Sequence, residues 1–452
     1  MFRKKNTLPP AATYKEVWRN GDQYTKLSFV FMGLAQIKNK QWAKGFAYLG
    51  TEIVFLLWFV FSGISTLSML TTLGVNKTKR VVYNQSQGVY ITKLPDNSVV
   101  ILLFGVLAVI LLLAMVFLYV TSLKSLRTLY VQNRDGTHVP TNKEQLSSLL
   151  DSKLHITLMS IPILGVMAFT VLPTLYMISM AFTNYDSKHP IGFSWTGFKA
   201  FGNVLTGDLA GTFFPVLGWT LVWAVAATAT TFFFGVLLAL LIESRGIKRK
   251  GLWRTIFVIV YAVPQFVSLL MMAQFLDLQG PLNTVLMNWG WIAHPINFIG
   301  ASANATVARI TVIVVNMWIG IPVSMLTSTA IIQNLPQDQI EAARMDGANP
   351  FQIFRRITFP QILFVMAPAL IQQFIGNINN FNVIFLLTGG YPMNNSYNGA
   401  GDTDLLVTWL YNLVFGQTQR YNASAVLGIL IFIISATVSL FAYRRTNAFK
   451  EG

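Results

Sequence analysis

Long apolar stretches alternate with short polar segments along almost the whole chain. A membrane-spanning helix needs about 20 mostly apolar residues. Eight stretches reach that length: residues 46–69, 99–120, 156–182, 213–242, 255–275, 307–332, 362–387 and 425–442. The second is the clearest, because its 22 residues carry no charge and reach roughly 33 Å at 1.5 Å per residue. The pattern predicts an all-α polytopic membrane protein with eight transmembrane helices.

The segments between these stretches define the predicted organisation. Residues 1–45 are polar and basic, unlike a signal peptide, and form a cytoplasmic or interfacial segment. An apolar run at 27–37 is too short to span a bilayer and is predicted to lie in the interface as one helix. Two N-terminal spans then occupy 46–120, a cytoplasmic linker 121–155, a membrane core 156–442 and a cytoplasmic tail 443–452.

Composition narrows the class of protein. The chain is 54% hydrophobic and only 11% charged, whereas soluble domains carry about 25% charged residues. These values exclude a soluble globule, and disorder is excluded because it requires low hydrophobicity. The chain has no Cys and only four scattered His, so disulfides, thiolate metal sites and Cys nucleophiles are excluded and no metal site is predicted.

The basic residues give the orientation. With the N-terminus inside, 25 of the 33 Lys and Arg lie in cytoplasmic segments and seven lie in external loops. The positive-inside rule therefore predicts that both termini are cytoplasmic. The net charge of +16 is then a topology signal first, with attraction to anionic inner-leaflet lipid as a secondary effect, and it gives little support to nucleic-acid binding.

The spans contain almost no charge that could couple transport to an ion. Glu52 and Arg309 lie near the ends of the first and sixth stretches, where long side chains can reach the interface. An ion-coupled transporter is therefore disfavoured, though not excluded. The sequence has no phosphate-binding GxxxxGK[ST] motif and no hydrolytic motif, so no catalytic residues are predicted. If ATP drives transport, another polypeptide binds the nucleotide.

The polar segment at residues 334–360 has the pattern of two short helices that meet at a corner. Pro336 suits a first helical turn, and Gly347 can adopt the left-handed conformation that ends a helix. Asn349 and Pro350 begin a second helix, and Pro360 is expected to close the segment. A rigid exposed elbow is suited to docking in a partner's groove. An ordinary amphipathic connector is the alternative that the physics leaves open.

This elbow contains the pattern EAA-x3-G-x9-I-x-F-P, which resembles the EAA motif of the membrane subunits of bacterial ABC importers. The resemblance implies a coupling helix that docks on an ATPase subunit, where Glu341 pairs with a basic group. ATP and Mg would be bound by those partner subunits, and this chain would hold no cofactor. The implied coupling residues are Glu341, Ala342, Ala343, Asp346, Gly347 and Pro360.

Four further segments resemble the maltose/maltodextrin permease of the MalF type: residues 261–264, 316–322, 377–381 and 400–407. The resemblance implies a type I importer core of six helices, with two extra helices at the N-terminus, in a bacterial cytoplasmic (inner) membrane. It also implies a second related permease, two ATPases and an extracellular sugar-binding protein as partners. One departure is clear. The loop at 183–212 is short, whereas the best-known members carry a large external domain there.

Uncharged polar residues recur within three of the predicted spans, as a sugar ligand would require. Tyr261, Gln265 and Ser268 share one helical face, Asn316 precedes an expected helix interruption at Gly320 and Pro322, and an amide stripe follows at Gln373, Asn377 and Asn380. Discontinuous membrane helices often mark a binding site. The substrate-binding positions implied by the resemblance are Tyr261, Asn316, Trp318, Ile319, Gly320, Asn377 and Asn380.

The sequence leaves two sets of alternatives open. Amides and hydroxyls can instead hold packed helices together, and this role is favoured for Ser268, Gln372 and Asn379. Val323 and Gly376 stand where the familiar maltose permease has aromatic residues, so a raffinose-type or mixed-linkage oligosaccharide is the alternative substrate to maltodextrin. An ion-driven sugar symporter is a less favoured function. A membrane glycosyltransferase is disfavoured because no acidic cluster occurs in a loop.

Overall fold

The computed structural model describes residues 12–86, 88–244, 246–417 and 419–445 and divides into two compact units, residues 1–195 and 196–452. Among the described residues, seven helices are long and apolar enough to cross a bilayer, and a sharply bent pair makes an eighth if it counts as one span. The predicted all-α architecture with eight spans is thus confirmed. The first eleven residues of the N-terminal segment and residues 446–452 of the predicted tail lie outside the described residues.

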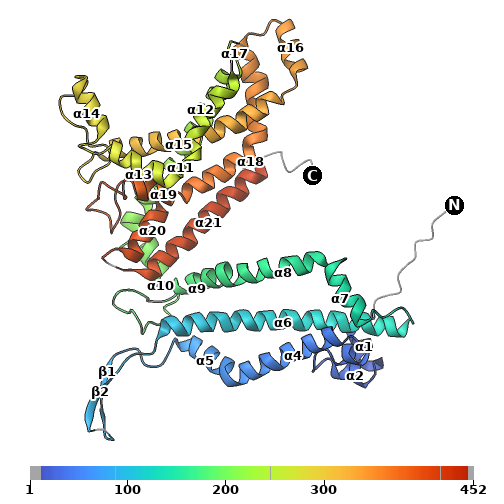
Figure 1. The fold of residues 1–452 in the computed structure, drawn as a ribbon. Helices are drawn as coiled ribbons and strands as arrows, with labels where there is room; N and C mark the ends of the chain where they lie inside the picture. The colour runs from blue at the N-terminus through green and yellow to red at the C-terminus, as the bar shows by residue number, and fades with distance from the viewer. Residues whose placement is uncertain (1–11, 87, 245, 418, 446–452) are drawn as a thin grey trace, which may run out of the picture. The chain divides into compact units, whose positions relative to one another are not determined.

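In the first unit, a long central helix packs against neighbours that follow and precede it in the chain (Figure 1). This helix, α6, runs from Ser98 to Arg134 and contacts α5 and α9. It continues 14 residues beyond the predicted end of the second span at residue 120. The other elements are α1 (Tyr14–Asn20), α2 (Gln23–Leu27), α3 (Leu34–Lys38), α4 (Trp42–Trp58), the π-helical turn η1 (Phe59–Gly63), α5 (Ile64–Thr72), β1 (Arg80–Asn84), β2 (Val89–Lys93), α7 (Asn142–Leu150), α8 (Leu154–Val166), the π-helical turn η2 (Met167–Val171) and α9 (Leu172–Met180).

One prediction for the first unit is wrong. The run at 27–37 is not one helix, because α2 ends at Leu27 and α3 begins only at Leu34, after Gly33 adopts φ = +91°. Glu52, predicted to lie near an interface, has a partner within the fold. Its side chain is 94% buried, and its carboxylate accepts the backbone N–H of Met32 at 2.6 Å. That N–H lies in the non-helical segment between α2 and α3, where it has no helical partner.

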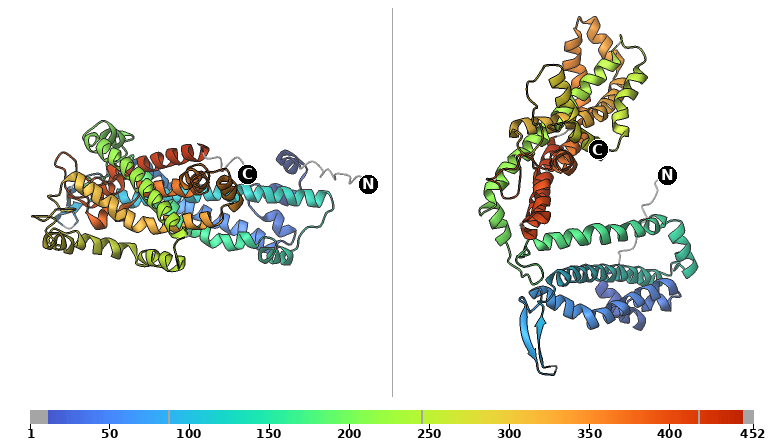
Figure 2. Two further views of the ribbon diagram at one scale, coloured as in Figure 1. Left: turned by 90° about the horizontal axis from the view of Figure 1, so that it is seen from above. Right: turned by 60° about the vertical axis from the view of Figure 1, so that its left-hand side comes forward.

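The segment between α5 and α6 contains a β-hairpin that the apolar pattern did not predict. Strands β1 and β2 pair antiparallel, with Tyr83 opposite Tyr90. The hairpin extends away from the helices of its unit (Figure 2). Both strands are five residues long, which is too short to stand out beside helices of 20 residues or more.

In the second unit, α11 and α15 form the central packed pair. The core around them contains Trp219 and Trp223 of α11 and Val312 of α15. The elements in chain order are α10 (Lys199–Leu205), α11 (Ala210–Glu243), α12 (Lys250–Ala262), α13 (Gln265–Phe275), α14 (Pro281–Asn288), α15 (Ala305–Gln333), α16 (Gln337–Met345), α17 (Pro350–Ile353), the π-helical turn η3 (Phe354–Thr358), α18 (Phe359–Ile378), α19 (Phe381–Leu387), α20 (Leu406–Phe415) and α21 (Tyr421–Arg445).

Glycines set the close approach of α11 and α15. A Cβ atom on Gly320 of α15 would lie 2.6 Å from Cγ2 of Thr231, and one on Gly235 of α11 would lie 2.4 Å from Cβ of Ser324. Small residues at such contacts let two membrane helices pack backbone to backbone. Gly320 therefore has a packing role, and α15 runs unbroken through Gly320 and Pro322. The expected interruption of this helix is wrong, because the packed neighbours keep a helix with an internal proline intact.

Two of the predicted spans are broken. The fifth bends by 88° between α12 and α13, where Pro264 cannot continue the hydrogen-bond ladder. The seventh, expected to be continuous from 362 to 387, ends at Ile378, and a separate helix, α19, begins at Phe381. Asn380 lies between them as the N-cap of α19, so the predicted stripe of Gln373, Asn377 and Asn380 is not one helical face.

Candidate functional site

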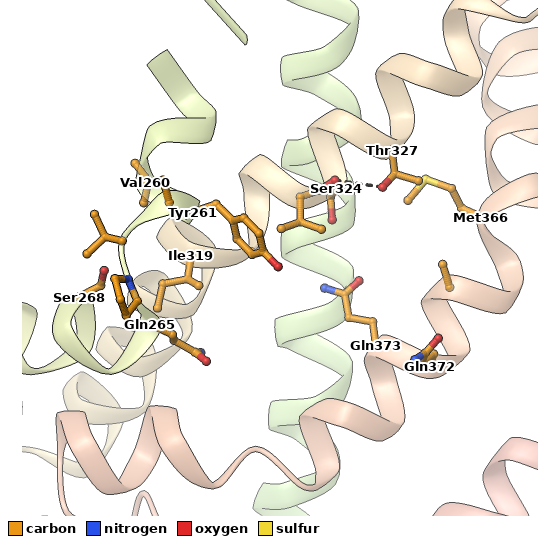
Figure 3. Close-up of a pocket in the computed structure, with 16 residues that line it drawn as sticks. Val260, Tyr261, Gln265, Ser268, Ile319, Ser324, Thr327, Met366, Gln372 and Gln373 are labelled. Carbon is orange, nitrogen blue, oxygen red and sulfur yellow. Dashed lines mark hydrogen bonds between the residues drawn. The ribbon is translucent and has the colours of Figure 1, made fainter. Parts of the chain in front are cut away.

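A cavity of about 710 Å³ lies between α12, α13, α15 and α18. Tyr261 and Gln373 point toward its middle from opposite walls (Figure 3). The bend at Pro264 is what forms it, because the bend brings Tyr261 of α12 and Gln265 of α13 to the same opening. The lining residues are Val260, Tyr261, Ala262, Val263, Pro264, Gln265, Ser268, Ile319, Gly320, Val323, Ser324, Thr327, Met366, Ala369, Gln372 and Gln373.

The polar groups of this cavity are uncharged, and several have no hydrogen-bond partner among the described residues. None of the lining residues is Asp, Glu, Lys, Arg or His. Gln373 donates from Nε2 to Oγ1 of Thr231 at 2.7 Å. The side chains of five other polar lining residues make no hydrogen bond to any described residue: Tyr261, Gln265, Ser268, Ser324 and Gln372. A cavity that combines apolar walls with free neutral hydrogen-bonding groups suits an uncharged polyhydroxyl ligand.

The cavity brings together three of the seven predicted substrate-binding residues: Tyr261, Ile319 and Gly320. Trp318 is 54% exposed and lines a different, almost wholly apolar cavity of about 450 Å³. Asn316 is buried within the helix packing.

The two predicted asparagines make contacts within the fold. Asn377 is buried, donates from Nδ2 to Oγ1 of Thr228 at 3.0 Å, and accepts at its backbone oxygen from Nε1 of Trp223 at 3.1 Å. Asn380 accepts the backbone N–H of Val383 at 3.3 Å as a helix cap. Neither residue lines the 710 Å³ cavity.

Sequence reasoning assigned polar lining residues wrongly or missed them: Ser268 and Gln372 were assigned to helix–helix contacts, and Ser324 and Thr327 were not predicted. Ser324 and Thr327 lie four and seven positions after Gly320 on α15, a helical spacing that places all three on one face. Gln372 was assigned to helix–helix contacts, yet it lines the cavity and has no partner among the described residues. The i, i+4, i+7 pattern in α15 was the signal that could have identified Ser324 and Thr327. For Gln372 the sequence offers no such signal, because Gln373 beside it does bond to a neighbouring helix.

The elbow between α15 and α18 has the predicted corner. Helix α16 ends at Met345, and Gly347 follows with φ = +81°. Asn349 then caps α17, accepting the backbone N–H of Gln352 at 2.8 Å, and the Gln352 side chain accepts the N–H of Asn349 at 2.8 Å. This reciprocal capping box fixes the start of the second helix.

One feature of the predicted elbow is wrong. Pro360 does not close the segment, because α17 continues through η3 into α18, with Pro360 in the first turn of that helix. The π-helical turn at Phe354–Thr358 directly precedes the proline, and Pro360 occupies the first turn of α18, a position where a proline is tolerated. The second arm of the elbow is therefore continuous with the seventh span.

The elbow presents an exposed surface. Glu341, Ala342 and Asp346 are exposed and Ala343 is half-buried. Met345 and Phe351 are 88% and 67% exposed. Large exposed apolar side chains beside polar ones are typical of a contact surface for another protein.

A charged cluster joins three helices at the end of α15. Glu243 of α11 forms ion pairs with Lys250 and Arg254 of α12. Gln333, the last residue of α15, donates to the same carboxylate at 3.5 Å. The helix that leads into the elbow is thus connected to the helix that carries Tyr261.

Comparison with known proteins identifies relatives along nearly the whole chain. The family described as "Binding-protein-dependent transport system inner membrane component" matches residues 232–448. The maltodextrin transport system permease protein MalC of Streptococcus pneumoniae is 34% identical over 93% of this chain and 95% of its own length. The galactooligosaccharides transport system permease protein GanP of Bacillus subtilis is 35% identical over 95% of this chain and 99% of its own length.

Two further matches show how far the similarity extends. The maltose/maltodextrin permease MalF of Escherichia coli is 32% identical over 58% of this chain, but the match spans only 51% of MalF. A crystal structure of a bacterial ABC transporter involved in import of the acidic polysaccharide alginate has a chain that is 22% identical, with a TM-score of 0.53 over 68% of this chain and 99% of that chain. This last similarity shows the fold alone.

The resemblance to permeases of the MalF type is confirmed by these matches. The many apolar helices agree with the inner-membrane location in the family's description. The chain therefore belongs to the family of multi-pass inner-membrane permease components of binding-protein-dependent ABC transport systems, whose members are transport subunits and not enzymes.

Proposed function

We propose that this protein is the permease subunit of an ATP-driven importer of neutral oligosaccharides, and that the cavity at the α12–α13 bend holds the sugar during passage. The supporting observation is the lining, which offers free hydroxyl and amide groups and no charge. A carboxylated saccharide would enter this cavity without a cation to pair with, at a cost of several kcal/mol. Maltodextrins are the first candidate substrate, as the names of MalC and its Bacillus subtilis relative MdxF suggest.

Another oligosaccharide is the second candidate: a galactooligosaccharide, or a raffinose-type or mixed-linkage sugar. The match to GanP supports it, because it covers 99% of that relative at 35% identity. Hydroxyl groups that differ only in orientation are distinguished by the positions of a few hydrogen-bond partners, and a site built to bond one hydroxyl arrangement strongly rejects another. The pattern of free amides in the cavity is therefore where specificity would reside.

A panel of sugars tests the substrate. The complete complex, with its binding protein, is reconstituted, and stimulated ATP hydrolysis is measured with maltodextrins and with galactooligosaccharides of matched length. Stimulation by one series alone identifies the substrate, and stimulation by neither contradicts the proposed substrate class. Uptake in vesicles that follows an ion gradient without ATP would instead favour a symporter.

Variants of the cavity test the site. Gln265→Met and Gln372→Met keep the side-chain volume but remove the free amides, so we expect weaker sugar-stimulated ATP hydrolysis. Gln274→Met is the matched control, because Gln274 also lies on α13 but does not line the cavity. Equal activity in all three variants would contradict the site.

Asn377 has two possible roles, which its hydrogen bond to Thr228 makes separable. If it contacts sugar, Asn377→Ala weakens transport without dissociating the ATPases, while Thr228→Val has a smaller effect. If it holds α18 against α11, the two variants lower the stability of the complex by similar amounts. Asn316, Trp318 and Asn380 stay proposed sugar contacts of the same kind, reached at another stage of transport.

We further propose that the elbow at 334–360 transmits the motion of two ATPase subunits. Glu341, Ala342, Ala343 and Asp346 form its docking surface, with exposed Met345 beside them. In this arrangement both termini are cytoplasmic, two extra helices at 46–120 precede a core at 156–442, and a second permease and an external sugar-binding protein complete the complex. The connection of Gln333 to Glu243 and Arg254 offers a route from the elbow to α12 and the cavity.

Two substitutions test the elbow. We expect Glu341→Ala and Gly347→Pro to abolish sugar-stimulated ATP hydrolysis of the assembled complex while the spans stay folded. Gln352→Glu is a control, because it keeps the side-chain acceptor of the capping box. Normal coupled turnover in both test variants would contradict the assignment.

A further inference from the structure

The first unit contains a second large cavity, of about 1080 Å³, that the transport path does not use. It lies where the start of α4, the later part of α6 and the helix α7 come together. The lining residues are Gln41, Ala43, Lys44, Ala47, Ser125, Thr128, Leu129, Gln132, His138, Pro140, Glu144, Gln145, Leu146, Ser148, Leu149 and Lys153. Most are polar, unlike the surfaces of the long spans beside them.

Two lysines enter this cavity without a counter-charge. Lys44 extends from the first turn of α4 and Lys153 from the segment after α7, and they lie close enough for their positive charges to repel each other. Neither side-chain ammonium group forms an ion pair or hydrogen bond with any described residue. Holding two like charges together costs free energy unless an anion is bound between them.

The one carboxylate among the described lining residues forms its hydrogen bonds at the start of α7. Glu144 accepts the backbone N–H of Thr141 at 2.8 Å and bonds to the ring of His138 at 2.9 Å. Both bonds are made by Oε2, so the carboxylate serves as the helix cap of α7, and it forms no ion pair with either lysine among the described residues. The amides of Gln132 and Gln145 have no partner in the described part of the chain, so neutral donors accompany the two cations.

Apolar surface begins directly beside this charged group. Leu146 and Leu149 line the cavity and are 47% and 38% exposed. On α4, Trp42 stacks on Phe46 with ring centroids 6.0 Å apart, and both rings are about half exposed. Tryptophan next to lysine at the end of a membrane helix is typical of the headgroup layer of a bilayer. The cavity thus has a cationic end and an apolar border at the depth where lipid headgroups lie.

We propose that this cavity binds the phosphate headgroup of an anionic phospholipid, with Lys44 and Lys153 on the phosphate and Gln132 and Gln145 donating to headgroup hydroxyls. A soluble phosphate ester offers the same phosphate. The apolar border favours the lipid, because the acyl chains would cover Leu146 and Leu149. Basic pockets between membrane helices are known to take such headgroups.

Native mass spectrometry of the assembled complex tests this site. The complex is titrated in neutral detergent with phosphatidylglycerol and, separately, with phosphatidylcholine, and competition is measured with glycerol 3-phosphate. We expect a retained phosphatidylglycerol whose binding weakens about fivefold when either lysine becomes glutamine, and about 30-fold in Lys44→Gln/Lys153→Gln. The double Lys→Arg variant keeps the charge and is expected to bind as the wild type does, which also shows that the site tolerates substitution.

Lys143→Gln is the matched control, because Lys143 lies on α7 but outside the cavity, and its binding is expected to be unchanged. Wild-type retention of phosphatidylglycerol by the double Lys→Gln variant would overturn the site. Equal retention of phosphatidylcholine, or displacement of the lipid by glycerol 3-phosphate at equimolar concentration, would overturn an anionic lipid as its ligand. None of these results depends on the proposed sugar or on the elbow.

Discussion

Asp404 lies in the folded loop between α19 and α20 and is 99% buried. Its Oδ2 accepts the backbone N–H of Gly401 at 2.8 Å and the amide of Asn412 at 3.1 Å. Its Oδ1 is buried without a partner among the described residues. Burial raises the pKa of this carboxyl from its ordinary value of 3.8 to about 6, because the two hydrogen bonds only partly replace lost water.

The raised pKa makes the loop less stable as the pH rises. The folded loop holds a proton more tightly than the unfolded one, so the stabilisation is fully present below about pH 3.8 and is lost as the pH passes through about 6. At about 1.4 kcal/mol per pH unit, the whole loss is about 3 kcal/mol. Roughly 2 kcal/mol of it falls between pH 4.5 and 7.5.

Asp404→Asn removes this dependence, because an amide resembles the protonated acid and does not titrate. Hydrogen exchange of peptides covering residues 388–405, corrected for intrinsic rates, is compared at the two pH values. Protection in the wild type is expected to fall about 30-fold from pH 4.5 to pH 7.5, and protection in Asp404→Asn is expected to stay constant. Asp402→Asn is the control in the same loop, because Asp402 contacts Arg309 and its loss cannot raise protection at pH 7.5. An equal change in wild type and Asp404→Asn would refute the reasoning.

Three further predictions concern packing and turns. Gly320→Ala places a methyl group 2.6 Å from Thr231 and should lower the stability of the complex by about 1–3 kcal/mol in a thermal unfolding assay. Gly218→Ala is the control, because its methyl group meets no atom within 4 Å. Equal melting temperatures of the two variants would contradict the close contact. Gly347→Ala strains a residue at φ = +81° by about 1–2 kcal/mol and should reduce sugar-stimulated ATP hydrolysis more than Gly347→Asn does. Glu52→Ala leaves a buried N–H without its acceptor and should destabilise the protein by about 1–3 kcal/mol in a denaturation assay, while Glu52→Gln should cost less.

The sequence predicts the helices of this protein well and their interruptions poorly. Length and hydropathy identify each span, because a bilayer requires a long apolar helix whatever its neighbours are. Whether a proline breaks the helix depends on those neighbours. Pro264 lies at an 88° bend, whereas Pro322 lies inside an unbroken helix that packs on α11. Both residues are prolines, so the sequence alone does not tell which of them breaks its helix.

The candidate site also has one part that the sequence predicts, the elbow, and one that it does not, the cavity. The elbow is local, and a glycine, a capping asparagine and a proline within four residues predict its corner at Gly347. The cavity instead depends on contacts between distant segments. Gln372 and Gln373 are adjacent amides, yet only Gln373 reaches Thr231 on α11. Which of the two is free for a ligand is decided by the rotation of α18, and sequence spacing does not fix that rotation.

The cavity and the elbow are built from the same helices, which limits how either can move. α15 carries Ser324 and Thr327 in the cavity wall and ends at Gln333, directly before the elbow. α18 continues the other arm of the elbow and carries Gln373 in the opposite wall. Helices are stiff along their axes, and α15 is packed against α11 without space for a methyl group at Gly320. Under the proposed coupling, we therefore expect a displacement of the elbow to be passed along α15 and α18 to the cavity. We expect this displacement to tilt the two cavity walls that α15 and α18 form, and a sugar held by hydrogen bonds to both walls would then be released or bound more tightly.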